Sequence, residues 1–360
     1  MKPPPVGTSP RGALNWFRTR LFATPFDALV TLACLALLAW TAPRILGWAV
    51  FHATWTGASR DACQGSGGAC WAFVTARFGQ FIYGFYPIAE RWRVDIAGLW
   101  LVLLILVAAG PPWRGKRAAV LGLGMPLPAG AAVLLLGGVP GLPLVETREW
   151  GGLMLTIVLA VAAGAIALPF GILLALGRQS GLPLVRSVAI AFIEFWRGVP
   201  ILAVIFLASI LLPLILPNGV TVDKLVRAIV GLALVVGAYM AEAVRGGLQS
   251  MPPGQAEAAK ALGLGYWLTT RHVVLPQALR IALPALVNEF IALLKNTTLV
   301  LIVSLLDLLG IGQAALADPK WVGLTAEAYS FAGAVFWILC FGMSRYSLRM
   351  ERRFAKARAR

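Results

Sequence analysis

A polar connector, residues 254–276, separates two long apolar stretches, and its residue spacing favours a docking element over a catalytic one. Two prolines end the preceding apolar segment, and the string AEAAKAL that follows is a strong helix former. Ala256, Ala259 and Gly263 recur at spacings of three and four, which predicts a helix face of nearly bare backbone that a partner can approach closely. The alternative is a solvated linker. The defining positions are Glu257, Ala258, Ala259, Gly263, Leu275 and Pro276.

A second polar group lies within an apolar stretch, where a charge is costly unless it is paired or faces water. Its members are Glu289, Lys295, Asn296, Thr297 and Thr298. We expect the helix to be interrupted near Lys295 and to line a path for a polar solute, because freed backbone groups and polar side chains can meet such a solute there. The alternative is that Lys295 snorkels or pairs and only fixes helix packing.

Two pairs of opposite charges stand three residues apart, Glu242 with Arg245 and Glu194 with Arg197. This spacing places each pair on one helix face, where it could serve as a gate or an interface contact. Exposed pairs of this kind contribute under about 1 kcal/mol, so a purely orienting role is the simpler alternative. Glu242 and Arg245 are kept as candidate gate residues.

No motif in the sequence supports catalysis. The string GPPWRGKR, residues 110–117, begins like a phosphate-binding loop but has Arg117 where such a loop needs Ser or Thr for magnesium, and no strand precedes it. His52 and His272 stand far apart, and no nucleophile, base and orienting group occur together. We therefore expect no enzyme activity, metal or cofactor in this chain.

The composition defines an integral membrane protein of the all-α class. Hydrophobic residues make up 59% of the chain, charged residues only 13%, and the mean hydropathy is +0.81. The net charge of +16 is scattered between apolar runs, which argues against nucleic-acid binding. Windows long enough to cross a bilayer as helices lie near residues 28–51, 96–112, 118–138, 151–176, 188–216, 225–243, 282–306 and 327–346.

Basic residues favour one orientation of these helices. Most Lys and Arg fall in the N-terminal leader, in alternate loops including 254–276, and in the tail RMERRFAKARAR. The positive-inside rule then places both termini and the connector in the cytoplasm. A cleaved signal peptide is the alternative for the first helix. Cys63 and Cys70 fall in a predicted outer loop, where they form either a disulfide or two free thiols.

Several strings together resemble one transporter family. The connector pattern E-A-A, three residues, Gly, nine residues, Val, one residue, Leu-Pro resembles the coupling loop of ABC importer permeases, with Val273 where the family more often has isoleucine. GILLALGR, IEFWRGVP, YMAEAVRGG and LLKNTTLV resemble the polar amino acid uptake branch of that family, closely the general L-amino acid permeases. The resemblance is strong from about Trp150 to Arg345 and weaker over residues 1–149.

The resemblance implies a type I importer in the bacterial inner membrane that translocates L-amino acids. Its expected partners are a second permease subunit (a different but similar chain, or a second copy), two ABC ATPase subunits that bind ATP and magnesium, and a periplasmic amino acid binding protein. The connector would dock on the ATPase. The alternatives are a secondary, ion-coupled transporter, a permease for another small polar solute, and a purely structural membrane subunit.

The chain is expected to have three parts. Residues 1–149 form an accessory N-terminal membrane segment with about three helices, residues 150–346 form a permease core of five helices, and residues 347–360 form a basic cytoplasmic tail. The boundary near residues 140–149 is predicted to be a loop rather than a soluble linker.

Overall fold

The computed structural model describes residues 10–111, 113–215, 217 and 222–358. In these ranges the regular secondary structure is helical, and no β-strand is formed. Two of the predicted windows, 96–112 and 188–216, end on residues outside the described ranges. The chain divides into two compact units, Met1–Ala76 and Arg77–Arg360. Isolated single-residue bridges occur in both units, but none extends into a strand.

The first unit is built around one exposed apolar helix. Helix α1 (Pro10–Arg20) precedes α2 (Pro25–Leu46), which continues as a π-helical turn, η1 (Gly47–Phe51). Thr24 caps α2 by accepting a hydrogen bond from the Asp27 backbone N–H, and the Asp27 carboxylate accepts one from the Thr24 backbone. No residue of α2 is buried, so its leucines and valines are free to contact lipid.

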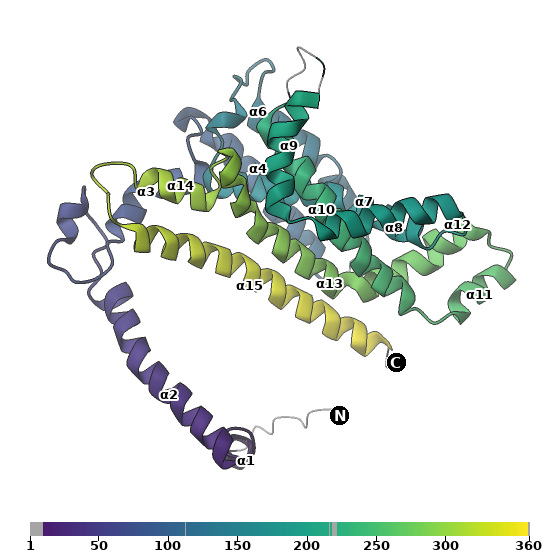
Figure 1. The fold of residues 1–360 in the computed structure, drawn as a ribbon, viewed down its shortest axis with the longest axis horizontal. Coiled ribbons are helices and arrows are strands. Elements are labelled where there is room, and N and C mark those ends of the chain that lie inside the picture. Colours follow the sequence, from purple (N-terminus) through teal and green to yellow (C-terminus); the bar gives the residue numbers. More distant parts are fainter. Residues whose placement is uncertain (1–9, 112, 216, 218–221, 359–360) are drawn as a thin grey trace. The chain divides into compact units, whose positions relative to one another are not determined.

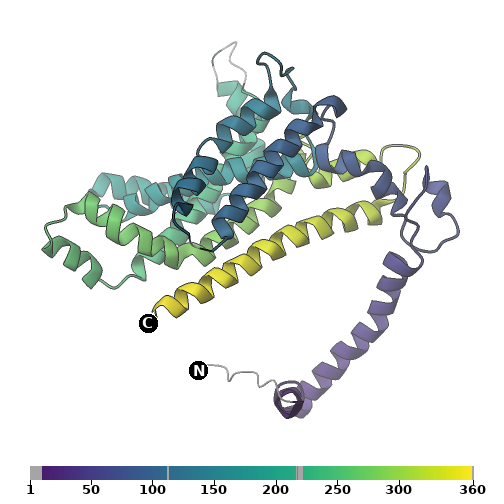
Figure 2. The same ribbon diagram turned by 180° about the vertical axis from the view of Figure 1, so that it is seen from behind.

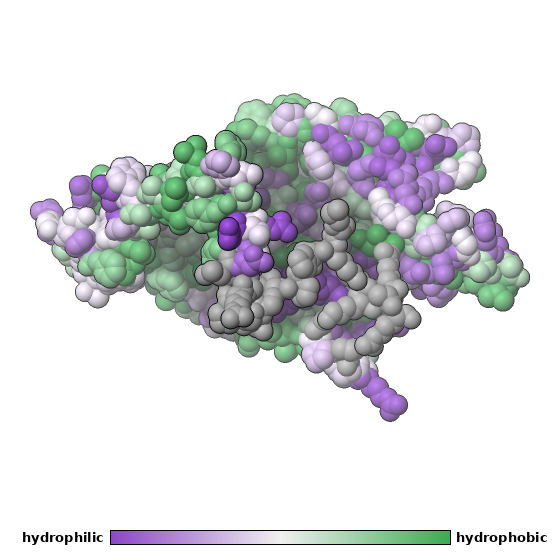
Figure 3. Space-filling model, turned by 90° about the horizontal axis from the view of Figure 1, so that it is seen from below, coloured by the Kyte–Doolittle hydropathy of each residue, from purple (hydrophilic) through white to green (hydrophobic). Residues whose placement is uncertain are grey.

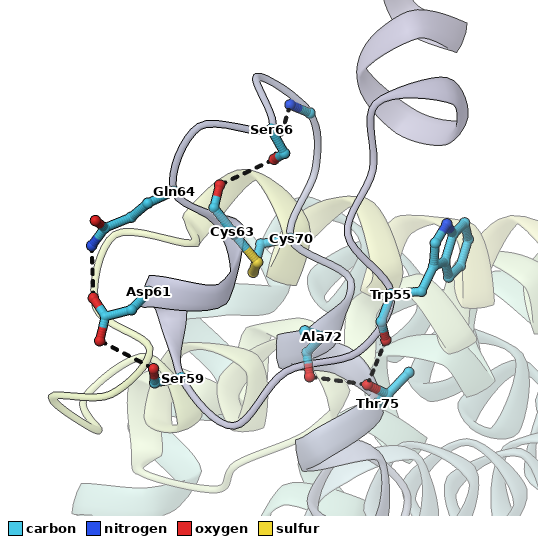
Figure 4. Close-up of a disulfide and its surroundings, with 10 residues drawn as sticks. Trp55, Ser59, Asp61, Cys63, Gln64, Ser66, Cys70, Ala72 and Thr75 are labelled. Atoms are coloured by element: carbon cyan, nitrogen blue, oxygen red, sulfur yellow. Dashed lines mark hydrogen bonds between the residues drawn. A yellow bond between two sulfur atoms is a disulfide. The ribbon is translucent and has the colours of Figure 1, made fainter.

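A loop that follows α2 is closed by a disulfide between Cys63 and Cys70, shown in Figure 4. The 3-10 turn η2 (Arg60–Cys63) leads into it, and Asp61 accepts hydrogen bonds from the side chains of Ser59 at 3.1 Å and Gln64 at 2.6 Å. After the loop, α3 (Ala72–Tyr83) begins. The free cysteines in the described residues are Cys34 and Cys340.

The second unit is a bundle in which α10 is the central helix. Its helices are α4 (Arg91–Ala109), α5 (Lys116–Gly124), α6 (Leu127–Leu136), α7 (Gly152–Arg178), α8 (Pro183–Gly198), α9 (Ile201–Ile215), α10 (Lys224–Gln249), α11 (Gly254–Ala261), α12 (Tyr266–Thr269), α13 (Leu275–Asn296), α14 (Leu308–Ala315) and α15 (Thr325–Arg358). Short turns are η3 (Ile88–Glu90), η4 (Thr147–Glu149), η5 (Thr270–Val274) and η6 (Thr297–Val303). Helix α10 packs against α7, α8, α9 and α13, and α15 runs along α13 (Figure 1, Figure 2).

Small residues let the central helices approach closely. A Cβ added to Gly171 of α7 would lie 2.8 Å from the backbone oxygen of Gly237 in α10. One added to Gly247 of α10 would lie 2.4 Å from the backbone oxygen of Ala278 in α13. Helices that pack in lipid gain stability from such close van der Waals contact, because lipid tails offer no hydrophobic driving force between helices. The two glycine contacts therefore fix α7 and α13 on either side of α10.

Seven helices are long and apolar enough to cross a membrane, or up to eight if one bent pair counts as a single span, within the part of the chain that the structure describes. That pair corrects the predicted continuous helix over 188–216, since α8 and α9 meet at an angle of 101°. The bend falls at Gly198-Val199-Pro200, where proline lacks a backbone N–H and disfavours helical backbone at the preceding residue. Hydropathy alone did not predict this break, because the segments on both sides of it are largely apolar.

Asp307 is a buried carboxyl group between membrane-spanning segments. Its side chain is 0% exposed, and Oδ1 accepts a hydrogen bond from the backbone N–H of Gly310 at 3.0 Å at the start of α14. Oδ2 has no hydrogen-bond partner among the described residues. Burial raises the pKa of Asp307 to about 6, because it disfavours the charged form.

We expect Asp307→Asn to stabilise the protein near neutral pH. The folded state binds the Asp307 proton more tightly than the unfolded state, so this group contributes stability below about pH 4 and loses it as pH rises to about 6. Asn keeps the helix cap and cannot ionise, which predicts a gain of about 3 kcal/mol at about pH 7.5. Thermal unfolding of solubilised protein across pH checks this. If the difference in melting temperature between Asp307→Asn and wild type does not shrink towards pH 4, ionisation of Asp307 is not the cause of the difference.

Candidate functional site

The connector folds as a short helix with a tight end. Helix α11 ends in a motif in which the backbone N–H of Gly263 donates to the oxygen of Lys260 at 2.9 Å and that of Leu264 donates to the oxygen of Ala259 at 3.1 Å. This pair of hydrogen bonds requires left-handed backbone at Gly263, whose φ is +78°. Helix α12 and the π-helical turn η5 then lead into α13, which begins at Leu275 as the sequence pattern predicts.

The exposed surface of the connector includes only part of the predicted small-residue face. Of the predicted small-residue face, Ala259 is only 4% exposed because α11 packs against η5 and α12, Ala256 is half-buried, and Gly263 is exposed. Glu257 and Ala258 remain exposed. Beside them lie large apolar side chains, with Leu262 82% exposed and Trp267 74% exposed. Sequence reasoning missed these two residues, although large apolar side chains in a polar connector were the available signal.

A cavity of about 370 Å³, the bend cavity, opens at the break between α8 and α9. Its lining residues are Arg197, Gly198, Val199, Pro200, Ile201, Val235, Val236, Tyr239, Glu289, Ala292 and Asn296. The break contributes five of them, while α10 and α13 supply the other walls. The Tyr239 hydroxyl donates to the Arg197 backbone oxygen at 3.4 Å, and the Arg197 guanidinium lies 5.6 Å from the Tyr239 ring centre. Most of the remaining wall is apolar.

The structure brings together only part of the predicted polar group of α13. Glu289 and Asn296 both line the bend cavity, seven residues apart on one face of the helix. Helix α13 ends at Asn296 and the 3-10 turn η6 follows. This change of helix type lies where the sequence predicted an interruption, near Lys295. Lys295 is exposed and is not among the lining residues.

The two threonines after Asn296 satisfy backbone groups. The hydroxyl of Thr297, which is buried, donates to the oxygen of Leu294 at 2.8 Å, and that of Thr298 donates to the oxygen of Lys295 at 2.9 Å. These bonds stabilise the change from α-helix to 3-10 helix. Of the predicted polar group, Glu289 and Asn296 are the residues that line the bend cavity.

Glu242 and Arg245 belong to a separate ion network. The Arg245 Nε donates to the Glu242 carboxylate at 2.8 Å, and Arg178 of α7 contacts both Glu242 at 3.3 Å and Glu194 at 3.0 Å. Arg197 lies 3.8 Å from Glu194. Arg178 thus links two pairs that the sequence suggested separately, because helix packing brings the end of α7 between α8 and α10.

These features define a class of protein. A multi-pass helical bundle with an exposed connector, and with a cavity that carries Arg197 and Glu289 among its spanning helices, is the arrangement expected of a membrane translocation subunit. The sequence matches the family described as "Binding-protein-dependent transport system inner membrane component" over residues 167–356. The chain belongs to that family, so it is a multi-pass inner-membrane permease subunit of a transport system rather than an enzyme.

Relatives match along the whole chain. The inner membrane amino-acid ABC transporter permease protein YhdY of Escherichia coli is 47% identical over 99% of this chain and 97% of the relative. The glutamate/glutamine/aspartate/asparagine transport system permease protein BztC of Rhodobacter capsulatus is 36% identical over 99% of this chain and 97% of its own length. A solved structure titled as an amino acid ABC transporter with histidines is 31% identical, covers 56% of this chain and 92% of its own, and has a TM-score of 0.49.

Proposed function

We propose that the chain is the amino-acid-translocating permease of an ATP-driven importer. The observation that carries the proposal is the bend cavity, which has a cation and an anion among its lining residues, Arg197 and Glu289. Every free amino acid carries a carboxylate and an ammonium group on its α-carbon, so these two side chains match the charges that all amino acids share. The names of the full-length relatives, an amino-acid permease and a glutamate/glutamine/aspartate/asparagine permease, support the same solute class.

Each group of the cavity has a role in this proposal. The Arg197 guanidinium offers a planar set of donors that suits a carboxylate. The Glu289 carboxylate accepts from the ammonium group, and Asn296 and Tyr239 provide neutral hydrogen-bonding groups. A volume of about 370 Å³ lies within the range of small-molecule sites, roughly 300–1,000 Å³.

The connector is proposed to couple this cavity to a separate ATPase. Its exposed residues, including Glu257, Ala258 and Leu262, would lie in a surface cleft of the ATPase, with Ala259 and Gly263 shaping the helix and Leu275-Pro276 starting α13. ATP and magnesium would bind in two ATPase subunits, and this chain would hold no cofactor. A different but similar permease chain and a periplasmic amino acid binding protein complete the proposed assembly.

Uptake by the reconstituted transporter tests the proposal. We expect vesicles containing the assembled transporter and the binding protein to accumulate labelled amino acids only when ATP is supplied to the ATPase. An ion gradient without ATP should not drive uptake. Uptake driven by a sodium or proton gradient alone would favour the secondary-transporter alternative, and accumulation of a solute without an amino acid group would overturn the substrate class.

We further propose that both termini and the connector face the cytoplasm. The basic loops support this orientation, and the disulfide between Cys63 and Cys70 suits an oxidising outer compartment. A membrane-impermeant maleimide should label these cysteines in intact cells only after reduction. Cysteine introduced as Lys260→Cys should be labelled only after the cells are permeabilised. Labelling of Lys260→Cys in intact cells would overturn the orientation.

A further inference from the structure

A second cavity, of about 440 Å³, lies at the connector end of the bundle, and half of its lining residues are arginines. Its lining residues are Arg178 and Gln179 at the end of α7, Arg186 and Ile190 of α8, and Arg245 and Gln249 at the end of α10. We call it the arginine cavity. Three different helices each contribute one guanidinium, and α10 leads from it into the connector. The bend cavity shares none of these residues.

Two of the three guanidiniums are held in place by carboxylates. Glu242 contacts Arg178 at 3.3 Å and accepts from Arg245 at 2.8 Å, and Glu194 contacts Arg178 at 3.0 Å. Neither glutamate lines the cavity. The carboxylates therefore fix the arginines from behind, and the lining itself carries no acidic group.

Arg186 is the third guanidinium, and it is exposed. Its side chain has no hydrogen bond or ion pair with any residue that the structure describes. Guanidinium groups bind phosphate strongly because their planar N–H groups match its oxygens. Three such groups around one cavity, one of them unengaged, favour an anion with several oxygen atoms over a single carboxylate.

The surroundings of Arg186 point to a lipid as the source of that anion. Leu184 is 76% exposed, and Leu182 and Val188 are exposed as well, so the start of α8 places apolar side chains beside the cavity. Figure 3 shows hydrophilic residues gathered at the end of the bundle that carries α8, α11 and α12, next to hydrophobic surface. Basic pockets at such a boundary suit a charged headgroup, and the apolar side chains suit its acyl chains.

We propose that the arginine cavity binds the phosphate of an anionic phospholipid headgroup. The headgroup would bridge α7, α8 and α10 at the point where α10 enters the connector. The inference uses the inner-membrane location of the family and does not depend on which solute is transported. Its test measures binding directly, so its failure is distinguishable from a failure of transport.

Native mass spectrometry of the intact transporter in detergent tests the proposal. The probes are short-chain phosphatidylglycerol, short-chain phosphatidylcholine and inorganic phosphate. We expect phosphatidylglycerol to bind to the wild-type complex, and Arg186→Gln to weaken this binding about tenfold through loss of one charge-assisted contact. Because Arg186 is exposed and unpaired among the described residues, the substitution should leave the melting temperature unchanged. Arg186→Lys should restore binding in part.

Arg280→Gln is the matched control, because it removes an exposed positive charge from α13 and does not line the cavity. It should leave phosphatidylglycerol binding within twofold of wild type. Equal weakening by both variants would overturn the site in favour of general surface charge. If phosphatidylcholine, whose headgroup has no net charge, binds as tightly as phosphatidylglycerol, the site does not select an anionic lipid. Binding of inorganic phosphate as tight as that of phosphatidylglycerol would show an anion site but overturn the lipid as its source.

Discussion

Gly263→Val is expected to reduce solute uptake by the assembled transporter strongly while the chain still inserts into the membrane. Gly263 has a φ of +78° and forms the end of α11, and a β-branched residue there costs roughly 1–3 kcal/mol. The connector would lose the turn that holds Glu257 and Leu262 in position. We expect uptake to fall at least about tenfold and ATP hydrolysis to become insensitive to the binding protein. Both are measured in reconstituted vesicles.

Gly265→Val provides a matched control in the same connector. An added Cβ meets no atom within 4 Å at either glycine, so neither substitution creates a steric clash within the chain. Gly265 has a φ of −65°, which any residue adopts, and its variant should keep most of the uptake. Gly263→Asn should also retain activity, because Asn tolerates left-handed backbone. Normal uptake by Gly263→Val would contradict a coupling role for this turn.

Glu289→Gln is expected to lower amino acid uptake about 10- to 100-fold. Glu289 lines the bend cavity, and the substitution keeps its shape while removing the charge proposed to meet the ammonium group. A hydrogen bond to a charged group contributes about 1.5–3 kcal/mol, and each 1.4 kcal/mol is a factor of about ten. Concentration-dependent uptake, together with substrate-stimulated ATP hydrolysis, gives the measurement. A drop in both, with an unchanged melting temperature, would place the loss in solute handling.

Lys295→Gln is the control for the cavity assignment. Lys295 lies on the same helix but is exposed and outside the cavity lining. We expect its uptake and ATP hydrolysis to stay within about twofold of wild type, a range of under 0.5 kcal/mol. Equal losses in Lys295→Gln and Glu289→Gln would contradict the cavity and return Lys295 to the solute path. Unchanged uptake in Glu289→Gln would remove Glu289 from it.

Local sequence rules predicted the connector well, because its structure depends on neighbouring residues. Two prolines and an alanine-rich string specify where α11 begins, and Gly263 specifies where it ends. These signals do not depend on the rest of the chain. The inward turn of Ala259 was not predicted, because it depends on the packing of α11 against η5 and α12. Spacing gives the face that residues share, but not the direction in which that face points.

The bend between α8 and α9 could not be predicted from hydropathy. Residues 188–216 are apolar throughout, so they predicted one span, although Pro200 was a local signal for a break. The size of the bend depends on how α8 and α9 each pack against α10. The Arg178 link between Glu194 and Glu242 also needs three helices whose positions are set by tertiary contact.

The sequence by itself determined the membrane class, the approximate spans, the connector and the family, because each depends on composition or on short fixed spacings. Only the tertiary structure decided that Glu289 and Asn296 face a cavity with Arg197 while Lys295 does not. It also gathered three arginines from three helices into one cavity. The physical reason is that helical periodicity orients side chains within one helix, whereas close packing through residues such as Gly171 and Gly247 sets which helices meet.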